Sequence, residues 1–435
     1  MSPITTITSR LLILLTSVWV VAAAALATRV AFAWDQQRKI PAQALASVPF
    51  DQETGNIALA LWQGKGFANL FRKPTGPTAW LAPAYPVLLF VVFKIFGAMT
   101  LASFFAAVLL NALFSAAATF PLFALGQRVG GWGLAAGAGW AWAFLPSGVL
   151  LPFEWIWDTS LSALLVTGLV WLTLRVAESS GVSEWIAYGL LWAVALLTNP
   201  ATAVGLPFLL GWALARARRS AHVSWARPML SVGVIFLCCL PWTVRNYRQF
   251  HRVIPVRSSL PFELWIGNND IFDPHAVHGI QRITRYEETH RYSELGENRY
   301  LEEKGQRAAA FIRQNPALFL RLTLRRILST WAGTEHPYDD FVQTDAMLAR
   351  VILVLNLVLT LGTAAGIVFL FVRKNASAFP MLVFPAFFPL IYYLTHTSLR
   401  YRHPIDPLLV LLTVFAASRC FHRAASTGNR PAVSS

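Results

Sequence analysis

The chain has 435 residues, of which 56% are hydrophobic and 13% are charged, so it is far more apolar than a soluble domain. Its net charge is +15, but the polar segment 244–346 is nearly neutral, with 14 Lys/Arg and 13 Asp/Glu. The surplus positive charge therefore lies in short loops and tails, which indicates membrane orientation and argues against a nucleic-acid groove. Cys238, Cys239 and Cys420 show neither disulfide nor metal-ligand spacing.

Apolar runs that are long enough to span a membrane, or nearly so, recur along the chain, and we read ten of them as transmembrane helices. The first could be a cleaved signal peptide, but its length exceeds the usual apolar core of about 7–15 residues, which favours an uncleaved helix. The run 184–216 could be one kinked element, because Asn199-Pro200 breaks it. The expected helices are 11–32, 101–125, 132–150, 159–176, 184–199, 200–216, 228–243, 347–372, 378–395 and 404–419.

Basic residues in the short loops predict which side of the membrane each loop occupies. If both termini are cytoplasmic, which agrees with an even helix count, the basic clusters face the cytoplasm and segments 33–100, 151–158, 244–346 and 396–403 face outside. Segment 81–97 is apolar but short and contains Lys94, so we read it as a helix lying in the interface. The inward clusters are Arg128, Arg175, Arg216/Arg218/Arg219/Arg227, Arg373/Lys374 and Arg419/Arg423.

These patterns predict an all-α integral membrane protein, a multi-spanning bundle of about ten helices with an interfacial first outer loop and a larger periplasmic loop. Within 317–331 one helical face is apolar and another carries Arg321 and Arg325, which suits either an anionic membrane surface or packing on the rest of the loop. The expected parts are a transmembrane module with its outer loop 33–100 (1–243), a periplasmic region (244–346), C-terminal transmembrane helices (347–423) and a disordered tail (424–435).

The stretch Phe50–Pro86 is the densest polar and aromatic segment between apolar helices, and its carboxylates are candidates for chemistry. Asp51 and Glu53 could supply a general base that takes a proton from an acceptor hydroxyl or amine as that group attacks a sugar carbon. They could equally begin a helix, with Asp51 as its N-cap and Glu53 in the first turn.

A second acidic pair, Glu154 and Asp158, lies in the sequence PFEWIWD at a predicted membrane boundary. A carboxylate there is costly unless it is paired or solvated, so it could bind an acceptor or orient the base. Asp158 could instead be the N-cap of the next helix.

Cations on the predicted outer side could bind a lipid-linked phosphate, because arginine forks match phosphate oxygens. The turn Arg400-Tyr401-Arg402 is the most compact of these basic groups. Anchoring in lipid headgroups is the alternative for several of them. The outer cations are Lys65, Arg72, Lys73, Arg245, Arg257, Arg400 and Arg402.

The layout resembles the GT-C glycosyltransferases, specifically the protein-mannosyltransferase-like and aminoarabinose-transferase-like membrane proteins of bacteria. The landmarks follow the family's order over most of the chain. They are an acidic residue in the first outer loop, A-x-x-L-x-x-G-x-G-F at 58–67, TGPTAWLAPAYPVLL at 75–89, PFEWIWD at 152–158, Pro241-Trp242-x-x-Arg245-Asn246-Tyr247, ELWIGNN at 263–269 and RYRHPIDP at 400–407.

The resemblance implies transfer of a hexose or pentose from a polyprenyl-phosphate donor to a lipid, glycan or protein, commonly with inversion, at the periplasmic face of the inner membrane. It assigns the first-loop carboxylate as base. The family usually has Asp there, whereas this chain has Glu53 at the matching distance from the Gly-x-Gly-Phe turn, with Asp51 close by. We therefore expect Glu53 as base, supported by Asp51 and Asp158. The expected substrate-binding residues are Lys65, Arg72, Tyr85, Glu154, Arg245, Arg400, Tyr401 and Arg402.

No cofactor and no nucleic-acid partner is expected, and a divalent metal is left open. Two rival functions share the lipid-linked donor. A non-enzymatic transporter or flippase would place paired charges at mid-membrane, whereas the acids here cluster at the outer boundary. An O-antigen ligase or polymerase would differ in the placement of its large outer loop.

Overall fold

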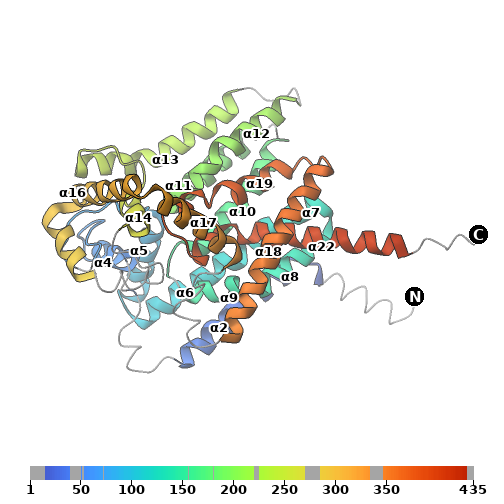
Figure 1. Cartoon of the computed structure of the whole chain (residues 1–435), viewed down its shortest axis with the longest axis horizontal. Coiled ribbons are helices and arrows are strands. Elements are labelled where there is room, and N and C mark those ends of the chain that lie inside the picture. Colours follow the sequence, from blue (N-terminus) through green and yellow to red (C-terminus); the bar gives the residue numbers. More distant parts are fainter. Residues whose placement is uncertain are drawn as a thin grey trace, which may run out of the picture.

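The computed structural model describes residues 15–39, 50, 53–71, 73–154, 156–179, 181–219, 225–269, 285–333 and 346–428. Within these ranges the regular structure is helical, apart from one isolated antiparallel bridge between Ala68 and Pro77. Figure 1 shows the helices as one bundle, with α10 inside it and α4, α5, α14 and α16 gathered at one end. The predicted all-α fold is therefore confirmed.

The helices of the first half begin with α2 and end with α12. Their bounds are α2 (Val18–Lys39), α4 (Glu53–Trp62), α5 (Ala84–Phe96), α6 (Leu101–Ala117), α7 (Thr119–Gly130), α8 (Trp132–Phe144), α9 (Pro146–Glu154), α10 (Thr159–Val176), α11 (Val182–Thr198), the 3₁₀ helix η1 (Pro200–Gly205) and α12 (Leu206–Arg219).

The second half contains the longest helices of the chain. Their bounds are α13 (Ala226–Phe250), α14 (Leu260–Gly267), α16 (Arg285–Gln314), α17 (Pro316–Ala332), α18 (Ala346–Val372), α19 (Ala378–Phe387), α20 (Leu390–Leu394), α21 (Leu399–Arg402), the 3₁₀ helix η2 (His403–Ile405) and α22 (Asp406–Gly428). Helix α22 thus runs past residue 423, where the sequence suggested that a tail begins.

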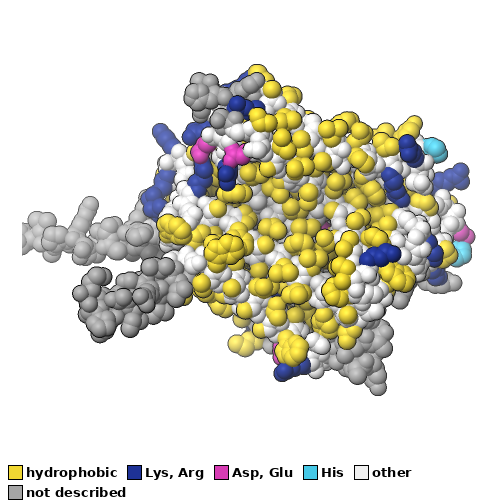
Figure 2. Space-filling model, turned by 180° about the vertical axis from the view of Figure 1, so that it is seen from behind, with side chains coloured by type: hydrophobic (Ala, Val, Ile, Leu, Met, Phe, Trp, Pro, Cys, Tyr) yellow, Lys and Arg dark blue, Asp and Glu magenta, His cyan; other side chains and the backbone are white. Residues whose placement is uncertain are grey.

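Five helical segments in the described ranges are long and apolar enough to cross a membrane, and α8 with α9, bent by 44°, would make a sixth. Figure 2 shows a broad hydrophobic band across one face, with Lys and Arg side chains toward its two ends. A multi-spanning helical membrane protein is therefore confirmed, although several of the ten expected runs form shorter apolar helices. The long segments are Val18–Lys39, Leu101–Gly130, Thr159–Val176, Ala226–Phe250 and Arg350–Val372, and the shorter ones are Ala84–Phe96, Val182–Thr198 and Ala378–Leu394.

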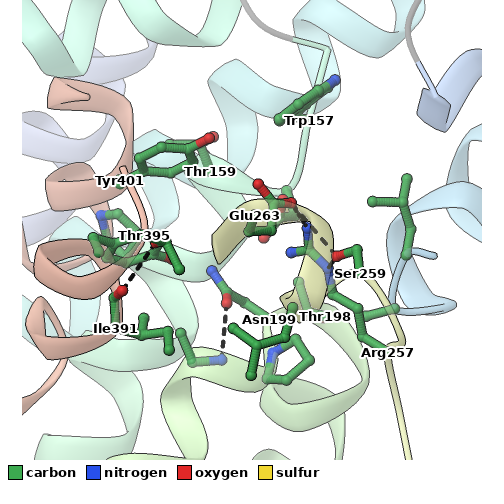
Figure 3. Close-up of a pocket in the computed structure, with 18 of the residues that line it drawn as sticks. Trp157, Thr159, Thr198, Asn199, Arg257, Ser259, Glu263, Ile391, Thr395 and Tyr401 are labelled. Carbon is green, nitrogen blue, oxygen red and sulfur yellow. Dashed lines mark hydrogen bonds and ion pairs between the residues drawn. The ribbon is translucent and has the colours of Figure 1, made fainter. Parts of the chain in front are cut away.

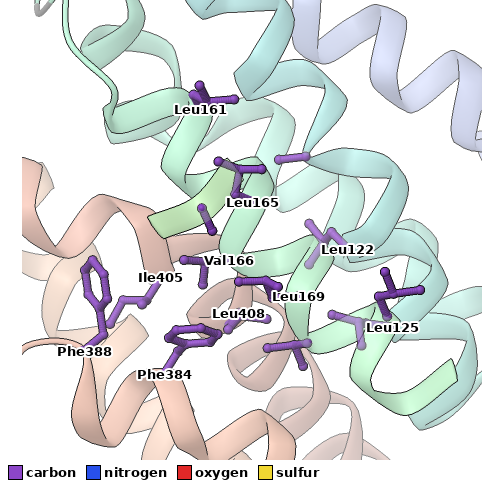
Figure 4. Close-up of a cluster of buried hydrophobic side chains, with 14 of the residues drawn as sticks. Leu122, Leu125, Leu161, Leu165, Val166, Leu169, Phe384, Phe388, Ile405 and Leu408 are labelled. Atoms are coloured by element: carbon purple, nitrogen blue, oxygen red, sulfur yellow. The ribbon is translucent and has the colours of Figure 1, made fainter. Parts of the chain in front are cut away.

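The core of the bundle surrounds α10. This helix is apolar on all sides, and such a helix is stable only when neighbours cover its whole circumference. Side chains from α7, α10, α19 and α22 interdigitate there, as Figure 4 shows for Leu122, Val166, Phe384 and Leu408, all of which are fully buried. Because α10 begins at Thr159, this packing fixes the position of Asp158, the residue just before it.

The break between α8 and α9 explains a buried cation in α2. Pro146 has no N–H, so the carbonyl of Trp142 cannot accept the usual helical hydrogen bond from residue 146. Arg29, which is 1% exposed, donates to the carbonyls of Trp142 and Ala143 at 3.2 Å and to Ser115 Oγ at 2.8 Å. The guanidinium thus donates hydrogen bonds to carbonyls at a buried helix end.

We expect Arg29→Met to lower the free energy of unfolding by about 1–3 kcal/mol, because it removes the buried guanidinium hydrogen bonds to Trp142, Ala143 and Ser115. Thermal unfolding of the purified protein in detergent measures the change. Arg38→Met, at the exposed end of the same helix, is the matched control. An equal loss of stability in both variants would contradict the role given to Arg29.

Helix α17 realises the amphipathic pattern of 317–331 with its apolar stripe turned outward. Leu320, Leu324 and Leu328 are 59%, 54% and 62% exposed, whereas Leu322 and Arg326 on the other side are buried. Arg326 donates to the carbonyls of Gly267, Tyr393 and Leu394. The helix is therefore fixed to α14 and α20 through an arginine and presents leucines away from the protein, an arrangement that fits a membrane surface.

Candidate functional site

A cavity of about 570 Å³ lies at one end of the bundle, where segments far apart in the sequence meet. Its wall combines the starts of α4 and α5, the segment before α10, the α11–η1 junction, the segment 257–266 and the chain from α19 to η2. Figure 3 shows Trp157 and Tyr401 on one side of it, Asn199 and Thr198 opposite, and Glu263 and Arg257 between them. The cavity therefore gathers carboxylates, guanidinium groups and aromatic rings.

Glu53 lines this cavity from the first turn of α4. The preceding chain is anchored by Phe50, which is 1% exposed and contacts the rings of Phe93 and Phe104 edge to face. Gly55 permits this approach, because a Cβ there would lie 2.3 Å from the Phe50 carbonyl oxygen. Glu53 thus begins a helix and also lines the cavity, so a place in the first turn of the helix does not exclude a role as general base. Asp51 lies outside the described residues.

The rest of the first outer loop folds back on α4. Gly64 and Gly66 adopt positive φ values of 76° and 73°, which close the turn after the helix. Asn56 donates to the Leu70 carbonyl at 2.9 Å, and Arg245 donates to the carbonyls of Phe67 and Thr78, each at 2.7 Å. Arg245 therefore holds the loop in shape from outside the cavity.

The buried carboxylate of Glu297 connects this loop to α16 through hydrogen bonds. It is 5% exposed and accepts hydrogen bonds from Thr78 Oγ1 at 2.5 Å, the Ala79 N–H at 2.9 Å, Ser258 Oγ at 2.7 Å and Tyr292 Oη at 2.7 Å. Hydrogen bonds to a charged acceptor are roughly twice as strong as neutral ones. Glu297 therefore positions the loop that carries Trp80 into the cavity wall.

We expect Glu297→Gln to loosen the loop 67–79, because the amide replaces one acceptor oxygen by a donor and removes the charge. The loss should be about 1.5–3 kcal/mol of local stability. Hydrogen exchange followed by mass spectrometry should show faster exchange in peptides from 67–82. Glu302→Gln, an exposed carboxylate of the same helix paired with Arg252, should leave that exchange unchanged. Unchanged exchange in both variants would contradict the role of Glu297.

Asp158 lines the cavity at the N-terminal end of α10. Its Oδ2 accepts a hydrogen bond from Ser162 Oγ at 2.9 Å, but the side chain does not cap the backbone of α10. Burial raises the pKa of Asp158, while the Ser162 hydrogen bond and the positive charges of Arg257 and Arg400 oppose this shift. Asp158 thus lies within the electrostatic influence of both arginines.

Arg400 and Tyr401 extend the cavity wall from α21. The Arg400 guanidinium carbon lies 4.0 Å from the centroid of the Trp157 ring, and Arg400 Nη2 donates to Tyr401 Oη at 2.8 Å. The Tyr401 ring stacks on Tyr392, with centroids 4.6 Å apart. Aromatic rings therefore orient a planar cation beside the cavity without neutralising its charge.

Three further ionisable residues of the cavity were not among the expected site residues: Arg257, Glu263 and His396. Arg257 donates to Glu263 Oε1 at 2.5 Å, and His396 Nε2 lies 2.9 Å from Tyr401 Oη and 3.7 Å from Glu263 Oε2. Burial lowers the pKa of His396, and the Glu263 charge opposes this. Arg257 belonged to the outer cations and Glu263 to the ELWIGNN landmark, so weak signals for both were present in the sequence.

The other expected site residues lie at different places. Tyr85 lines the cavity and donates to Asn111 Oδ1 at 2.8 Å. Lys65 is exposed in the glycine turn, and Glu154 ends α9; neither lines the cavity. Arg402, 1% exposed, binds Asp406 Oδ1 at 3.0 Å and Asn356 Oδ1 at 2.6 Å behind the cavity wall. Arg72 lies outside the described residues.

The structure therefore brings together Glu53, Tyr85, Asp158, Arg400 and Tyr401, and it does not bring Lys65, Glu154, Arg245 or Arg402 to the same cavity. Within the described ranges, no group of three or more His, Cys, Asp or Glu side chains is arranged to hold a metal ion.

Solved structures provide the comparison for this fold. Oligosaccharyltransferase AglB from Archaeoglobus fulgidus, in complex with an inhibitory peptide and a dolichol-phosphate, aligns with a TM-score of 0.53 and 14% identity over 96% of this chain and 52% of that chain. The apo form of the oligosaccharyltransferase from the same organism gives 0.51 and 15% identity, again over 96% and 52%. This chain thus spans about half the length of those proteins.

ArnT from Cupriavidus metallidurans, bound to undecaprenyl phosphate, aligns over 89% of this chain and 78% of that chain, with 15% identity. Its TM-score of 0.37 is too low to map its elements onto this fold. In sequence, no protein-family model and no curated protein matches the chain. The likeness to AglB shows that the chain shares the architecture of this oligosaccharyltransferase, a multi-span helical membrane fold like the one that the resemblance predicted.

Proposed function

We propose that the protein is a membrane glycosyltransferase that moves a sugar from a polyprenyl-phosphate donor to an acceptor in the large cavity, with inversion. The observation that carries the proposal is the convergence of Glu53, Asp158 and Arg400, far apart in the sequence, on one cavity. The active site would face the periplasm in a bacterial inner membrane, since the basic loop residues predict the opposite side to be cytoplasmic.

Glu53 is the proposed base. It lies in the first turn of α4, near the positive end of the helix dipole. An ionised carboxylate at the cavity wall can take a proton from the attacking hydroxyl or amine of the acceptor. Asp158, which lines the same cavity, is proposed to support it, and Asp51 remains a candidate for the same supporting role.

Arg400 is the proposed contact for the donor phosphate, with Tyr401 beside it. The departing lipid phosphate is a good leaving group that needs charge stabilisation rather than protonation, and a fixed guanidinium provides that stabilisation. Arg257 is a second cation on the same cavity, although Glu263 already pairs with it. Lys65 and Arg402 do not contact the donor phosphate in this scheme, because neither lines the cavity.

The polyprenyl chain of the donor requires an apolar surface that continues from the phosphate site toward lipid. Residues of α19 and α20 form such a wall beside Tyr392 and Arg400: Phe387, Phe388, Leu390, Ile391 and Leu394. Leu390 and Leu394 are also 43% and 44% exposed. The bound dolichol-phosphate of AglB, a protein with this architecture, supports a lipid-linked donor for this chain as well.

The test uses the purified protein in vesicles with a polyprenyl-phosphate sugar radiolabelled in the sugar, and membrane extract as the source of acceptor. We expect label to move from the lipid to the acceptor and free polyprenyl phosphate to appear in equal amount, both only when extract is present. Unchanged donor that has crossed the vesicle membrane would identify a flippase and overturn the proposal. Extension of a glycan already linked to lipid would instead identify a ligase or polymerase.

A further inference from the structure

A second cavity, of about 310 Å³, lies between α12, α18 and α19, and the proposed function does not use it. We call it the basic cavity, after its two cations. Its main lining residues are Trp212, Arg216, Phe371, Lys374, Ala378 and Phe379.

The basic cavity lies at the opposite end of two elements that also form the large cavity. Ala201 and Val204 of η1, directly before α12, line the large cavity, whereas Arg216 near the end of α12 lines the basic cavity. The segment Ala378–Leu394 also connects the two cavities: its start lines the basic cavity and its end lines the large cavity. A helix of 14 residues such as α12 is about 21 Å long, so the two cavities are separate sites on opposite sides of the bundle.

The charge of the basic cavity is not balanced by acidic groups. No Asp or Glu lines it, and no ion pair of Arg216 or Lys374 with a carboxylate occurs among the described residues. By contrast, Arg175, at the same end of the bundle, pairs with Glu184 at 2.8 Å. The dipoles of α12 and α18 stabilise cations at the C-terminal ends of these helices. This stabilisation explains the presence of Arg216 and Lys374, but it does not explain the cavity beside them.

The remaining wall is aromatic and apolar. Trp212, Phe371 and Phe379 border the same space as the two cations. Aromatic rings are typical of the boundary between lipid tails and headgroups, and basic pockets between membrane helices on the cytoplasmic side accommodate anionic headgroups. A ligand that matches this wall carries a negative charge next to hydrocarbon.

We propose that the basic cavity binds an anionic phospholipid, with its phosphate between Arg216 and Lys374 and its upper acyl segments against Trp212, Phe371 and Phe379. The side of the membrane predicted from the basic loops, the cytoplasmic leaflet, is the one that such lipids would approach. The proposal does not depend on glycosyl transfer at the large cavity.

The test titrates the purified full-length protein, in a neutral detergent, with phosphatidylglycerol and follows its thermal unfolding. Phosphatidylcholine with the same acyl chains and inorganic phosphate are the comparison ligands. We expect phosphatidylglycerol to raise the unfolding temperature more than either. The double variant Arg216→Gln/Lys374→Gln should bind phosphatidylglycerol about twenty-fivefold more weakly, because each cation near a lipid phosphate contributes about a fivefold effect.

The control is Arg175→Gln, which removes an exposed, paired cation at the same end of the bundle and should keep the response to phosphatidylglycerol. Arg216→Lys/Lys374→Arg keeps both charges and should also keep this response. If the double glutamine variant fails to fold, the test compares this charge-preserving variant with Trp212→Leu, which should bind phosphatidylglycerol more weakly. Equal responses to phosphatidylglycerol and phosphatidylcholine would overturn the proposal. A full response to inorganic phosphate would replace the lipid by a soluble anion.

Discussion

Glu53→Gln should reduce sugar transfer by roughly 10²–10⁴ in kcat, the usual contribution of a positioned general base. The amide keeps the size and the position in the first turn of α4, but it cannot accept a proton from the acceptor. Donor binding should change little, because the proposed phosphate contact, Arg400, lies on another element. Single-turnover release of polyprenyl phosphate, with donor affinity measured in parallel, separates the two effects.

Glu302→Gln is the matched control, since it removes a carboxylate from an exposed ion pair outside the cavity. Its transfer rate should equal that of the unchanged protein. Full activity of Glu53→Gln would remove this residue from the role of base. An equal loss of donor affinity and of turnover would instead indicate that Glu53 organises the cavity.

Arg402→Met should destabilise the protein by about 3–5 kcal/mol, because it leaves Asp406, which is 1% exposed, as a buried charge without its main partner. His403 Nδ1, 3.0 Å from the other carboxylate oxygen, compensates only in part. The hydrogen bonds from Arg402 to Asn356 and to the Thr330 carbonyl are also lost. Thermal unfolding in detergent measures the effect.

Two comparison variants make this prediction specific. Arg402→Met/Asp406→Leu removes both charges and should regain much of the lost stability, since a buried ion pair can be replaced by apolar groups. Arg400→Met, two residues earlier, should leave the unfolding temperature nearly unchanged and raise KM for the donor. A raised KM with unchanged stability in Arg402→Met would show that Arg402, not Arg400 alone, binds the donor.

The difference between Arg400 and Arg402 could in part be predicted from the sequence. Once the turn is known to be helical, as α21 is, arginines two positions apart are expected to point in different directions. Arg402 and Asp406 have the spacing of an ion pair within a helix. The family resemblance assigns the whole basic turn to the donor phosphate and therefore does not distinguish Arg400 from Arg402.

The apolar runs predicted the helices well, because membrane spans follow from local composition alone. The bend at Pro146 was missed, since apolar residues continue on both sides of it and 132–150 reads as one run. Arg29 could not be interpreted from sequence, because its acceptors in α8 become available only through that bend.

The site was predicted in part. Glu53, Asp158 and Arg400 were expected site residues, whereas Glu263, within the ELWIGNN landmark, and His396, in the segment 396–403, were assigned no role. Their place in the cavity depends on how α14 packs between the first outer loop and α20, and no local pattern encodes such packing. Tertiary contacts therefore decided which ionisable residues meet.

The bonds of Glu297 to Thr78 and Ala79 join residues 219 and 218 positions apart in the chain. Ribosomes add about 5–20 residues per second, so the segment carrying Thr78 leaves the ribosome roughly 10–45 seconds before its partner exists. During synthesis the loop 67–79 therefore remains without its Glu297 hydrogen bonds until α16 has been made. The part of the cavity wall that carries Trp80 therefore reaches its final position only after α16 has been made.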